Sequence, residues 1–410
     1  MISYRFRLYP SRTVKTTLMG QLDLCRWLYN RLLEELNKAK AEGRKLNSND
    51  TQHLLVELKE DKPELDSVYS KALQMVNYQL WSNIRSLSGA KANGRKIGRL
   101  RFKGAGWFKT INYNQSGFSV ERKRLLLSKV GSIPIKLHRK TEGVVKGVII
   151  KRQSSGRWFA IFQCDAPAKK LPATGRSVGI DMGIKFFLSD SDGRQIENPH
   201  YYERTSLKLG VVQRVLSRKK KGSSNRSKQK VRLAKLHEKL VDQRNDFLHK
   251  LSRYYVNSYD MIAVEDLRIA NMVKNHNLAR RILDASWGKF RQMLSCKAES
   301  AGRKVVAVNP RRTSQECKHG KIDRDYNASL NILERGLQAV SGLGRPFEPV
   351  EIEPLLYPIR ILASNIVEAG SPCPLGQGSS QAKVYLYHEK DGIDQRGFKR
   401  WTYPRSYTSC

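Results

Sequence analysis

Apolar residues recur at helical spacing through the N-terminal part of the chain. The first stripe predicts a helix over about 13–42 and consists of Leu18, Leu22, Cys25, Leu28, Leu32 and Leu36. Similar stripes predict helices over about 50–59 and 66–87. A short alternating segment, 3–9, stops at Pro10 and predicts an opening strand. Stripes of this kind are typical of a helix-bundle core rather than of a cofactor site.

The hydrophobic period changes near Gly94, where short segments punctuated by glycines replace the helical spacing. These segments predict β-strands at 99–102, 110–113, 124–128, 145–152 and 158–163. They are typical of a small antiparallel barrel or sandwich, to which the opening strand could add. The helices would then be an insertion that interrupts the barrel.

A linker with two prolines and two lysines, 166–175, precedes an α/β pattern. Strands are predicted at 177–188, 261–265 and 304–308. Helices are predicted over 205–258 with a break at 221–227, over 285–301 and over 327–336. The remainder, 337–410, is rich in Gly, Pro and Ser without a sustained period, and we expect a poorly ordered or loosely docked tail.

The charge balance is the unusual feature of the composition. The 410 residues include 76 Lys and Arg against 37 Asp and Glu, a net charge of +39. Self-repulsion of this size strains the compact state unless a polyanion is bound. Nucleic-acid phosphates are the first candidate and membrane surfaces the second. With no CxxC pair, no signal peptide and no apolar stretch long enough to span a membrane, we expect a soluble cytoplasmic protein, nucleoid-associated in a prokaryote.

Three carboxylates occupy positions where burial would make them costly. Asp181 lies within the apolar strand segment 178–183, Glu265 ends the apolar run 261–264, and Asp325 precedes a helix start. Three such groups converging from distant parts of the chain would repel one another, and divalent cations with a preference for oxygen, Mg²⁺ or Mn²⁺, would relieve the repulsion. Two such ions can support in-line phosphodiester cleavage.

Each carboxylate also has a structural interpretation. Asp181 could be a turn residue at a strand end, and Glu265 could be a helix cap or a surface charge. Asp325 could be a helix N-cap, or Asp323 could take the chemical role instead. The three acids together, in the order strand–acid, strand–acid, acid–helix, indicate a metal site more specifically than any one of them does.

The segments around these acids resemble a known family. Gly179–Gly183, Val264–Leu267 and Asp323–Ala328 resemble the three nuclease motifs of the TnpB family, transposon-encoded RNA-guided nucleases related to the type V CRISPR effectors. Asn309–Pro310, Thr313–Gln315, Arg101–Lys103, Tyr4–Pro10 and Cys25–Asn30 are further matches. The resemblance covers about residues 1–335.

The resemblance implies a multidomain α+β fold. Its expected parts are a wedge β-barrel (1–12 and 95–170), a helical recognition domain (13–94), a ribonuclease H-like domain of the RuvC type (176–335) and a tail (336–410). It implies Asp181, Glu265 and Asp325 as metal ligands and catalytic acids. It also implies a guide RNA from the transposon end and double-stranded target DNA cut beside a short transposon-adjacent motif.

One family feature is absent from the sequence. Family members usually carry a zinc ribbon of the form CxxC…CxxC before the last motif, beside the nuclease cleft, where it helps to hold target nucleic acid. Between 317 and 323 this chain has only Cys317 and His319, which cannot supply the four ligands of a structural zinc site. The ribbon looks deleted, so we predict no bound zinc and weaker DNA loading or cleavage.

Two basic segments are candidates for nucleic-acid contact. No acid lies in 214–235, whose alternative interpretation is a solvated helical face with a flexible loop. In segment 95–109, Lys and Arg side chains are interleaved with aromatic side chains, a pattern that suits phosphate contact and stacking. The alternative interpretation of this segment is a strand edge protected by charge. The candidate residues are Arg99, Arg101, Lys103, Arg218, Lys219, Lys220, Lys221, Arg226 and Lys228. Gln74, Tyr113 and Asn114 resemble, by position, family segments that approach the adjacent motif.

Three hypotheses follow. The first is a Mg²⁺- or Mn²⁺-dependent, RNA-guided DNA endonuclease that works as a monomeric ribonucleoprotein. The second is an RNA-guided DNA-binding protein with little or no cleavage, which the missing ribbon favours. The third is a guide-independent transposition accessory or general RNA-binding protein. The RNA that copurifies would separate them.

Overall fold

The computed structural model describes residues 2–315, 322–341 and 359–361. The chain forms two compact units, which are described separately. The first unit comprises 1–172, 200–246 and 299–302. The second comprises 173–199, 247–298 and the chain from 303 onward. The boundaries therefore pass within elements, and α5 (Ser224–Ser258) contributes to both units.

The first unit contains a seven-stranded antiparallel sheet with the order β2-β6-β7-β1-β5-β4-β3. Its strands are β1 (Ile2–Leu8), β2 (Thr110–Asn114), β3 (Phe118–Glu121), β4 (Arg124–Leu127), β5 (Gly131–Lys136), β6 (Val144–Arg152) and β7 (Trp158–Asp165). The opening strand β1 lies in the middle, paired with β7 from Ile2–Cys164 to Leu8–Trp158 and with β5 on its other side. The expectation that the opening strand joins strands from beyond the helices is confirmed.

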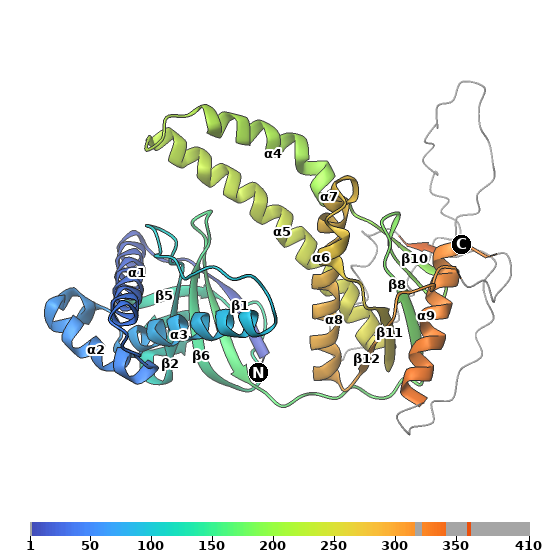
Figure 1. Ribbon diagram of the computed structural model, residues 1–410, viewed down its shortest axis with the longest axis horizontal. Coiled ribbons are helices and arrows are strands. Elements are labelled where there is room, and N and C mark those ends of the chain that lie inside the picture. Colours follow the sequence, from blue (N-terminus) through green and yellow to red (C-terminus); the bar gives the residue numbers. More distant parts are fainter. Residues whose placement is uncertain (1, 316–321, 342–358, 362–410) are drawn as a thin grey trace, which may run out of the picture. The chain divides into compact units, whose positions relative to one another are not determined.

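Three helices are inserted between β1 and β2, namely α1 (Arg12–Ala41), α2 (Ser48–Asp61) and α3 (Ser70–Ala92), with a 3₁₀ turn, η1 (Pro63–Ser67), before α3 (Figure 1). Ser11 caps α1 by accepting a hydrogen bond from the backbone N–H of Val14. The predicted stripe of α1 is buried and shares one hydrophobic core with α3 and the sheet. The helical insertion and the sheet therefore stabilise each other.

The prediction of a strand at 99–102 is wrong, because that segment forms no ladder. Side chains of α1 hold the end of this loop instead. Asn30 Oδ1 accepts from the backbone N–H of Lys103 at 2.7 Å, and Asn30 Nδ2 donates to the Lys103 carbonyl at 3.0 Å. Strands β3 and β5 were not predicted, because β3 has only four residues and β5 contains Pro134.

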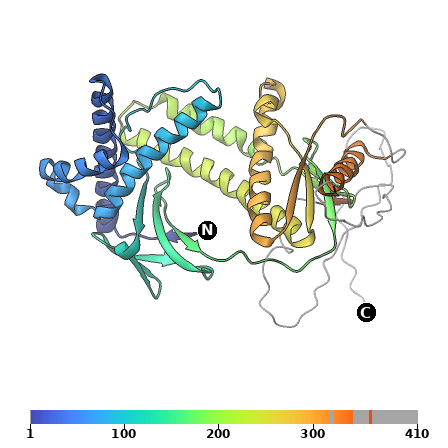
Figure 2. The same ribbon diagram turned by 60° about the horizontal axis from the view of Figure 1, so that its bottom comes forward.

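Helices α4 (Tyr201–Arg218) and α5 run side by side, joined by a short turn, as both views of the ribbon show (Figures 1 and 2). The predicted break in the helical segment is confirmed, although it lies at 219–223. Arg226 closes the turn by donating to the carbonyls of Leu216 and Lys219 at 2.7 and 2.9 Å.

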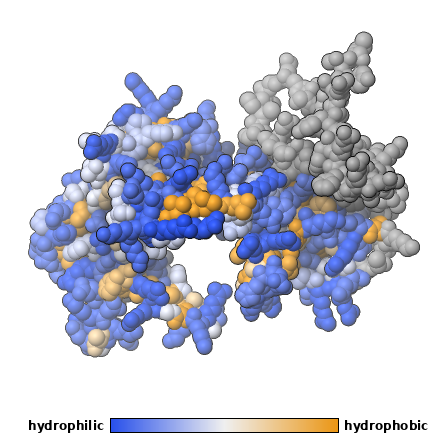
Figure 3. Space-filling model, turned by 90° about the horizontal axis from the view of Figure 1, so that it is seen from above, coloured by the Kyte–Doolittle hydropathy of each residue, from blue (hydrophilic) through white to orange (hydrophobic). Residues whose placement is uncertain are grey.

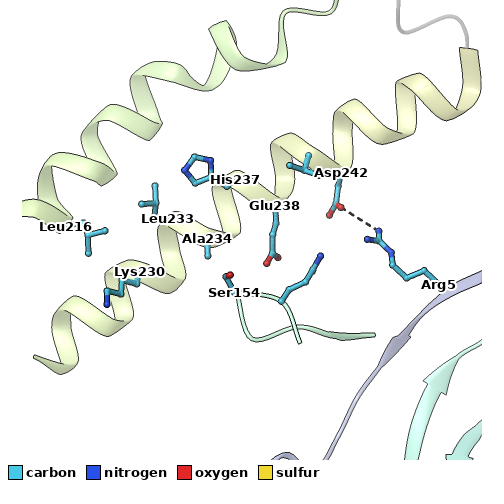
Figure 4. A pocket seen from close by; sticks show the side chains of 11 residues that line it. Arg5, Ser154, Leu216, Lys230, Leu233, Ala234, His237, Glu238 and Asp242 are labelled. Atoms are coloured by element: carbon cyan, nitrogen blue, oxygen red, sulfur yellow. Dashed lines mark ion pairs between the residues drawn. The ribbon is translucent and has the colours of Figure 1, made fainter. Parts of the chain in front are cut away.

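Helix α5 is fastened to the turn between β6 and β7 by ion pairs. Arg157 donates to Glu238 at 2.9 Å and to Asp242 at 3.0 Å, and Glu238 also accepts from the backbone N–H of Ser155. Beside these pairs lies a cavity of about 390 Å³. The side chains that line it and are labelled in Figure 4 come from α4, α5, β1 and the β6–β7 turn. The ion pairs fix the helical pair relative to the first sheet.

The second unit contains a six-stranded mixed sheet with the order β12-β11-β8-β9-β10-β13. Its strands are β8 (Ser177–Asp181), β9 (Phe186–Asp190), β10 (Arg194–Glu197), β11 (Met261–Glu265), β12 (Lys304–Val308) and β13 (Ile359–Ile361). The predicted single strand 177–188 is in fact the antiparallel pair β8–β9. Strands β11 and β12 lie parallel to β8.

Helices α6 (Ile269–Met272), α7 (His276–Ala285), α8 (Trp287–Ala301) and α9 (Arg324–Ser341) complete this unit. Two glycines let α9 approach the sheet closely. A Cβ on Gly179 of β8 would lie 2.1 Å from the Ser329 carbonyl oxygen, and one on Gly336 of α9 would lie 2.5 Å from the Cβ of Ala263 on β11. Larger side chains at these positions would push the helix off the sheet.

The sequence beyond α9 falls mostly outside the described residues, and so do Cys317 and most of the segment where the ribbon looks deleted. Helix α9 continues past the predicted end at 336 to Ser341. Of the tail, β13 pairs in parallel with β10. Among the helices that the structure describes, none combines the length and apolarity needed to cross a membrane.

Candidate active site

Asp181 and Glu265 end two neighbouring parallel strands at the same edge of the second sheet. Asp181 is the last residue of β8 and Glu265 the last of β11, each one residue after the paired Ile180 and Val264. Side chains two residues apart share a face of a strand, so Asp181 faces the same way as Gly179, and Glu265 the same way as Ala263. Both carboxylates therefore lie on the face that α9 covers.

Asp325 lies in the first turn of α9, above that edge. The cap of the helix is Asp323, whose Oδ1 accepts from the backbone N–H groups of Asp325 and Tyr326 at 3.0 and 3.1 Å. The N-cap role that the sequence left open for Asp325 thus belongs to Asp323. Gln195 of β10 donates to the same carboxylate oxygen at 3.0 Å and ties the helix start to the sheet.

The three candidate acids interact electrostatically. Burial, together with the negative charges of Glu265 and Asp325, raises the pKa of Asp181 to about 7. Burial also raises the pKa of Glu265, against a hydrogen bond from Thr313. The pKa of Asp325 is raised by burial and by Asp323. Such shifts mark carboxylates that lack full compensation by positive charge.

Neighbouring side chains orient Glu265. The Thr313 hydroxyl donates to Glu265 Oε1, and Asn331 of α9 donates to the Thr313 carbonyl at 2.8 Å. Arg291 of α8 donates to the Glu265 carbonyl at 3.3 Å and pairs with Asp266 at 2.9 Å. Thr313 belongs to a segment that the resemblance had singled out, whereas no sequence signal marked Gln195, Arg291 or Asn331.

The donor set matches the chemistry of a hard divalent cation, since all three side chains offer carboxylate oxygens. Within the described residues, however, no three His, Cys, Asp or Glu side chains converge closely enough to form a complete metal site. The carboxylates are thus near enough to repel one another without meeting at a common point.

The opposite face of the same sheet carries a different buried carboxylate. Asp190 of β9 pairs with Ile180 in register, so it points away from the face of Asp181. It is fully buried and accepts from Arg194 Nε at 2.9 Å and from the Tyr255 hydroxyl at 2.8 Å. Here a guanidinium and a phenol within the fold lower the pKa of Asp190, although burial outweighs them and leaves that pKa raised.

The predicted nucleic-acid contacts are mostly exposed. Arg99 and Arg101 lie in the loop before β2, while Lys103 is half-buried with its ammonium 5.3 Å from the Tyr29 ring centre. The α4–α5 turn and its flanks carry four exposed basic side chains, Arg218, Lys220, Lys221 and Lys228. Lys219 in the same turn is half-buried. Arg226 is committed to closing that turn.

The three residues predicted to read the adjacent motif lie in the first unit. Tyr113 is 1% exposed, its hydroxyl bonds Gln21 at 3.2 Å, and its ring stacks on Tyr69. Gln74 and Asn114 are half-buried. Tyr113 thus has a packing role in the core.

Three family profiles match the chain. One described as "Probable transposase" (OrfB_IS605) matches residues 160–276, a "Cas12f1-like, TNB domain" matches 287–332, and a "Helix-turn-helix domain" (HTH_OrfB_IS605) matches 1–45. The second match contains both Thr313 and Asp325.

Relatives align over most of the chain. A "Putative RNA-guided DNA endonuclease" of Streptomyces pristinaespiralis is 32% identical, over 85% of this chain and 92% of the relative. The "Putative RNA-guided DNA endonuclease InsQ" of Escherichia coli is 29% identical over 77% and 82%. The "TnpB-like protein L79" of Acanthamoeba polyphaga mimivirus is 23% identical over 82% and 73%.

These matches define a transposon-encoded class of proteins. The chain belongs to the TnpB family, and the resemblance carried by the three acidic motifs is confirmed.

Proposed function

We propose that this chain is an RNA-guided DNA endonuclease that hydrolyses phosphodiester bonds with divalent metal ions. The observation that carries the proposal is the proximity of Asp181, Glu265 and Asp325 at one sheet edge, where the pKa of Asp181 is raised by burial and by both other acids. The names of the relatives support a guide RNA and a DNA target. The sheet order β10-β9-β8-β11-β12, an antiparallel meander extended by two parallel strands, supports a ribonuclease H-like domain of the RuvC type.

The protein's own residues would divide the work at this edge. Asp181, Glu265 and Asp325 would hold Mg²⁺ or Mn²⁺, which supplies an activated water and stabilises the charge on the phosphate. Thr313 and Asn331 fix the orientation of Glu265, and Asp323 with Gln195 fixes the start of α9. No covalent intermediate with the protein is needed.

The test is cleavage of plasmid DNA carrying a matched target by the purified ribonucleoprotein in the presence of Mg²⁺. Target-dependent cutting that disappears on chelation and in Asp181→Ala would support the proposal. Unchanged cutting by Asp181→Ala or Glu265→Ala would reject the assigned residues. Tight guide-dependent binding without scission would select the RNA-guided binding protein instead, and RNA of no defined sequence would favour a guide-independent role.

A further inference from the structure

The cavity of about 390 Å³ lies within the first unit, beside the ion pairs that fasten α5 (Figure 4). One face of α5 lines it from Lys230 to Asp242. The other sides come from α4, β1 and the β6–β7 turn, through Leu216, Arg5 and Ser154. A cavity of this size suits a small molecule, and the proposed cleavage reaction does not use it.

The cavity has apolar walls. Leu233, Ala234 and Val241 line it from α5, and Leu216 lines it from α4. The face of the molecule seen in Figure 3 is mostly hydrophilic, with apolar residues confined to a band and a few patches. Apolar walls inside a cavity of so basic a chain favour a ligand that combines an uncharged body with polar ends.

Asp242 has hydrogen-bonding capacity left at one end of the cavity. Its Oδ2 accepts from Arg157 at 3.0 Å, whereas its Oδ1 lies 3.7 Å from Arg5 Nη2, which is too far for a hydrogen bond. The Asp242 side chain is 35% exposed, against 13% for Glu238, whose two oxygens accept from Ser155 and Arg157. Asp242 and Arg5 therefore present a carboxylate and a guanidinium side by side.

A carboxylate beside a guanidinium matches the polar edge of guanine. Guanine presents two neighbouring donors, N1–H and the N2 amine, which the two oxygens of one carboxylate accept. Its O6 lies next to them and accepts from a guanidinium. Adenine and cytosine place an acceptor nitrogen on this edge, and uracil places a carbonyl on each side of its single donor. The pattern therefore selects guanine among the four RNA bases.

Lys230 lies at the other end of the cavity, about 18 Å along α5 from Asp242. Its side chain is exposed, and an ammonium binds phosphate as a point charge. His237 lies between them on the same face of the helix, and its ring can stack on a base. A nucleotide whose base pairs with Asp242 therefore lies along the apolar walls with its phosphates toward Lys230.

We propose that this cavity binds a guanine nucleotide. Asp242 and Arg5 recognise the edge of the base, the apolar walls cover its rings, and Lys230 contacts the phosphates. The inference concerns the first unit and does not rest on the proposed cleavage. A free nucleotide and an unstacked guanosine of a bound RNA offer this same chemistry, and the experiment distinguishes the two sources.

The experiment measures the affinity of the full-length chain, freed of RNA, for GTP, ATP and xanthosine triphosphate (XTP) by equilibrium dialysis. A chelator in the buffer prevents nucleotides from binding to the acids of the second unit through a metal ion. GTP and ATP carry the same charge, so the ratio of their affinities removes the general attraction of a basic chain for phosphates. We expect GTP to bind about tenfold more tightly than ATP.

Asp242→Asn exchanges one carboxylate oxygen for an amide donor. It should lower the affinity for GTP about tenfold and raise the affinity for XTP, because xanthine has a carbonyl at C2 where guanine has an amine. Damage to the fold does not produce such a gain, and thermal melting checks the fold. Asp246→Asn, one turn further along α5 and outside the lining of the cavity, should leave both affinities unchanged.

Lys230→Gln tests the phosphate end. It should weaken binding of GTP about tenfold and binding of GMP less, because the single phosphate of GMP lies nearer the base and farther from Lys230. Lys239→Gln removes an exposed cation on the opposite side of α5 and should match the wild type with both nucleotides.

The purified ribonucleoprotein distinguishes the two sources of the nucleotide. GTP binding that persists in the ribonucleoprotein assigns the cavity to a free nucleotide. The alternative source gives a different result: GTP binding is lost, and one guanosine of the RNA is protected from a reagent that modifies N1 and N2 of guanine. That protection should disappear in Asp242→Asn.

Three results would overturn the inference. Equal affinities for GTP and ATP would show that only the phosphates are bound. Unchanged GTP binding by Asp242→Asn would exclude the assigned carboxylate, and loss of GTP without a gain of XTP would show that Asp242 does not touch the base. The cleavage test depends on Asp181 and Glu265, so none of these results would decide the proposed function.

Discussion

The two faces of the second sheet handle buried carboxylates in opposite ways. On one face Asp190 is fully buried, and Arg194 and Tyr255 compensate it within the fold. On the other face Asp181 lies near Glu265 and Asp325, and burial together with repulsion from both acids raises its pKa. In the first arrangement Arg194 and Tyr255 offset part of the cost of burial, which still raises the pKa of Asp190. In the second the described residues include no such hydrogen-bonded partner, and a bound cation would offset the cost instead. The difference distinguishes a structural ion pair from a candidate active site better than burial alone.

The largest expected effect is on catalysis at the uncompensated face. Replacing Asp181 by Ala should lower the cleavage rate by about a thousandfold or more, because a transition-state interaction worth several kcal/mol is lost. Binding of guide RNA should be unchanged. Single-turnover cleavage and a gel-shift assay measure the two quantities.

The matched control is Asp266→Ala, which removes an exposed carboxylate next to Glu265 that pairs with Arg291. This variant should cut within a few-fold of the wild type. If Asp266→Ala lost as much cutting as Asp181→Ala, the location of an acid at the end of β8 or β11 would not distinguish the catalytic acids from their neighbours.

The next effect is on stability at the compensated face. Arg194→Met should leave Asp190 buried without its cation and lower the free energy of unfolding by about 3–5 kcal/mol. Arg176→Met removes an exposed arginine that pairs with Asp192, and should cost less than about 1 kcal/mol. Chemical denaturation compares them, and equal losses would refute the buried character of the Asp190 pair.

Asp181→Asn is expected to raise the free energy of unfolding of the metal-free protein, by less than Arg194→Met lowers it. The pKa of Asp181 is about 7 in the folded state against an ordinary value of 3.8, so the folded state binds more protons between these pH values. Wild-type stability from this group is therefore present below about pH 4 and is lost as the pH rises to about 7. The amide removes that loss, which is on the order of 1–4 kcal/mol at neutral pH.

Melting temperatures between pH 4 and 8 test this sign, with Mn²⁺ added as a second variable. The cation should stabilise the wild type more than Asp181→Asn at pH 7. A variant that melts below the wild type at pH 7 without metal would show that Asp181 is compensated in a way that the comparison with Asp190 does not capture.

The smallest effect is expected for Gln195→Ala, which removes the hydrogen bond to Asp323 at the start of α9. The free energy of unfolding should fall by about 1 kcal/mol. Amide exchange should become faster at Asp325 and Tyr326, because their backbone N–H groups donate to Asp323. Cleavage should fall about three- to tenfold. Gln338→Ala, on the exposed side of the same helix, should change neither exchange nor cleavage.

The sequence predicted the parts of the fold that follow from periodic burial. The stripe of α1 and the strand β11 appear where their apolar patterns place them. The three acids were recognisable because a charged carboxylate beside a buried apolar strand is energetically costly. The resemblance to the family's motifs then indicated that the three acids act together, which no single position showed.

The remainder could not be predicted because its causes are long-range. The apolar run 177–188 gave no sign of the hairpin that divides it into β8 and β9, since both strands are buried. Gln195 acts only because β10 places it opposite Ser189, in the row that continues to Asp181. Contacts of this kind depend on the finished sheet, and a local pattern does not contain them.

The central place of β1 in the first sheet has a consequence for synthesis. β1 precedes its partners in the chain, and its ladder pairs Ile2 with Cys164, so its neighbours on β7 are synthesised much later. At about 5–20 residues per second, the edge of β1 that pairs with β7 waits for roughly ten to thirty seconds. Helices α1, α2 and α3, which come between β1 and its partners, can form during that interval and cover apolar surface, and we expect this to lower the tendency of the nascent chain to aggregate.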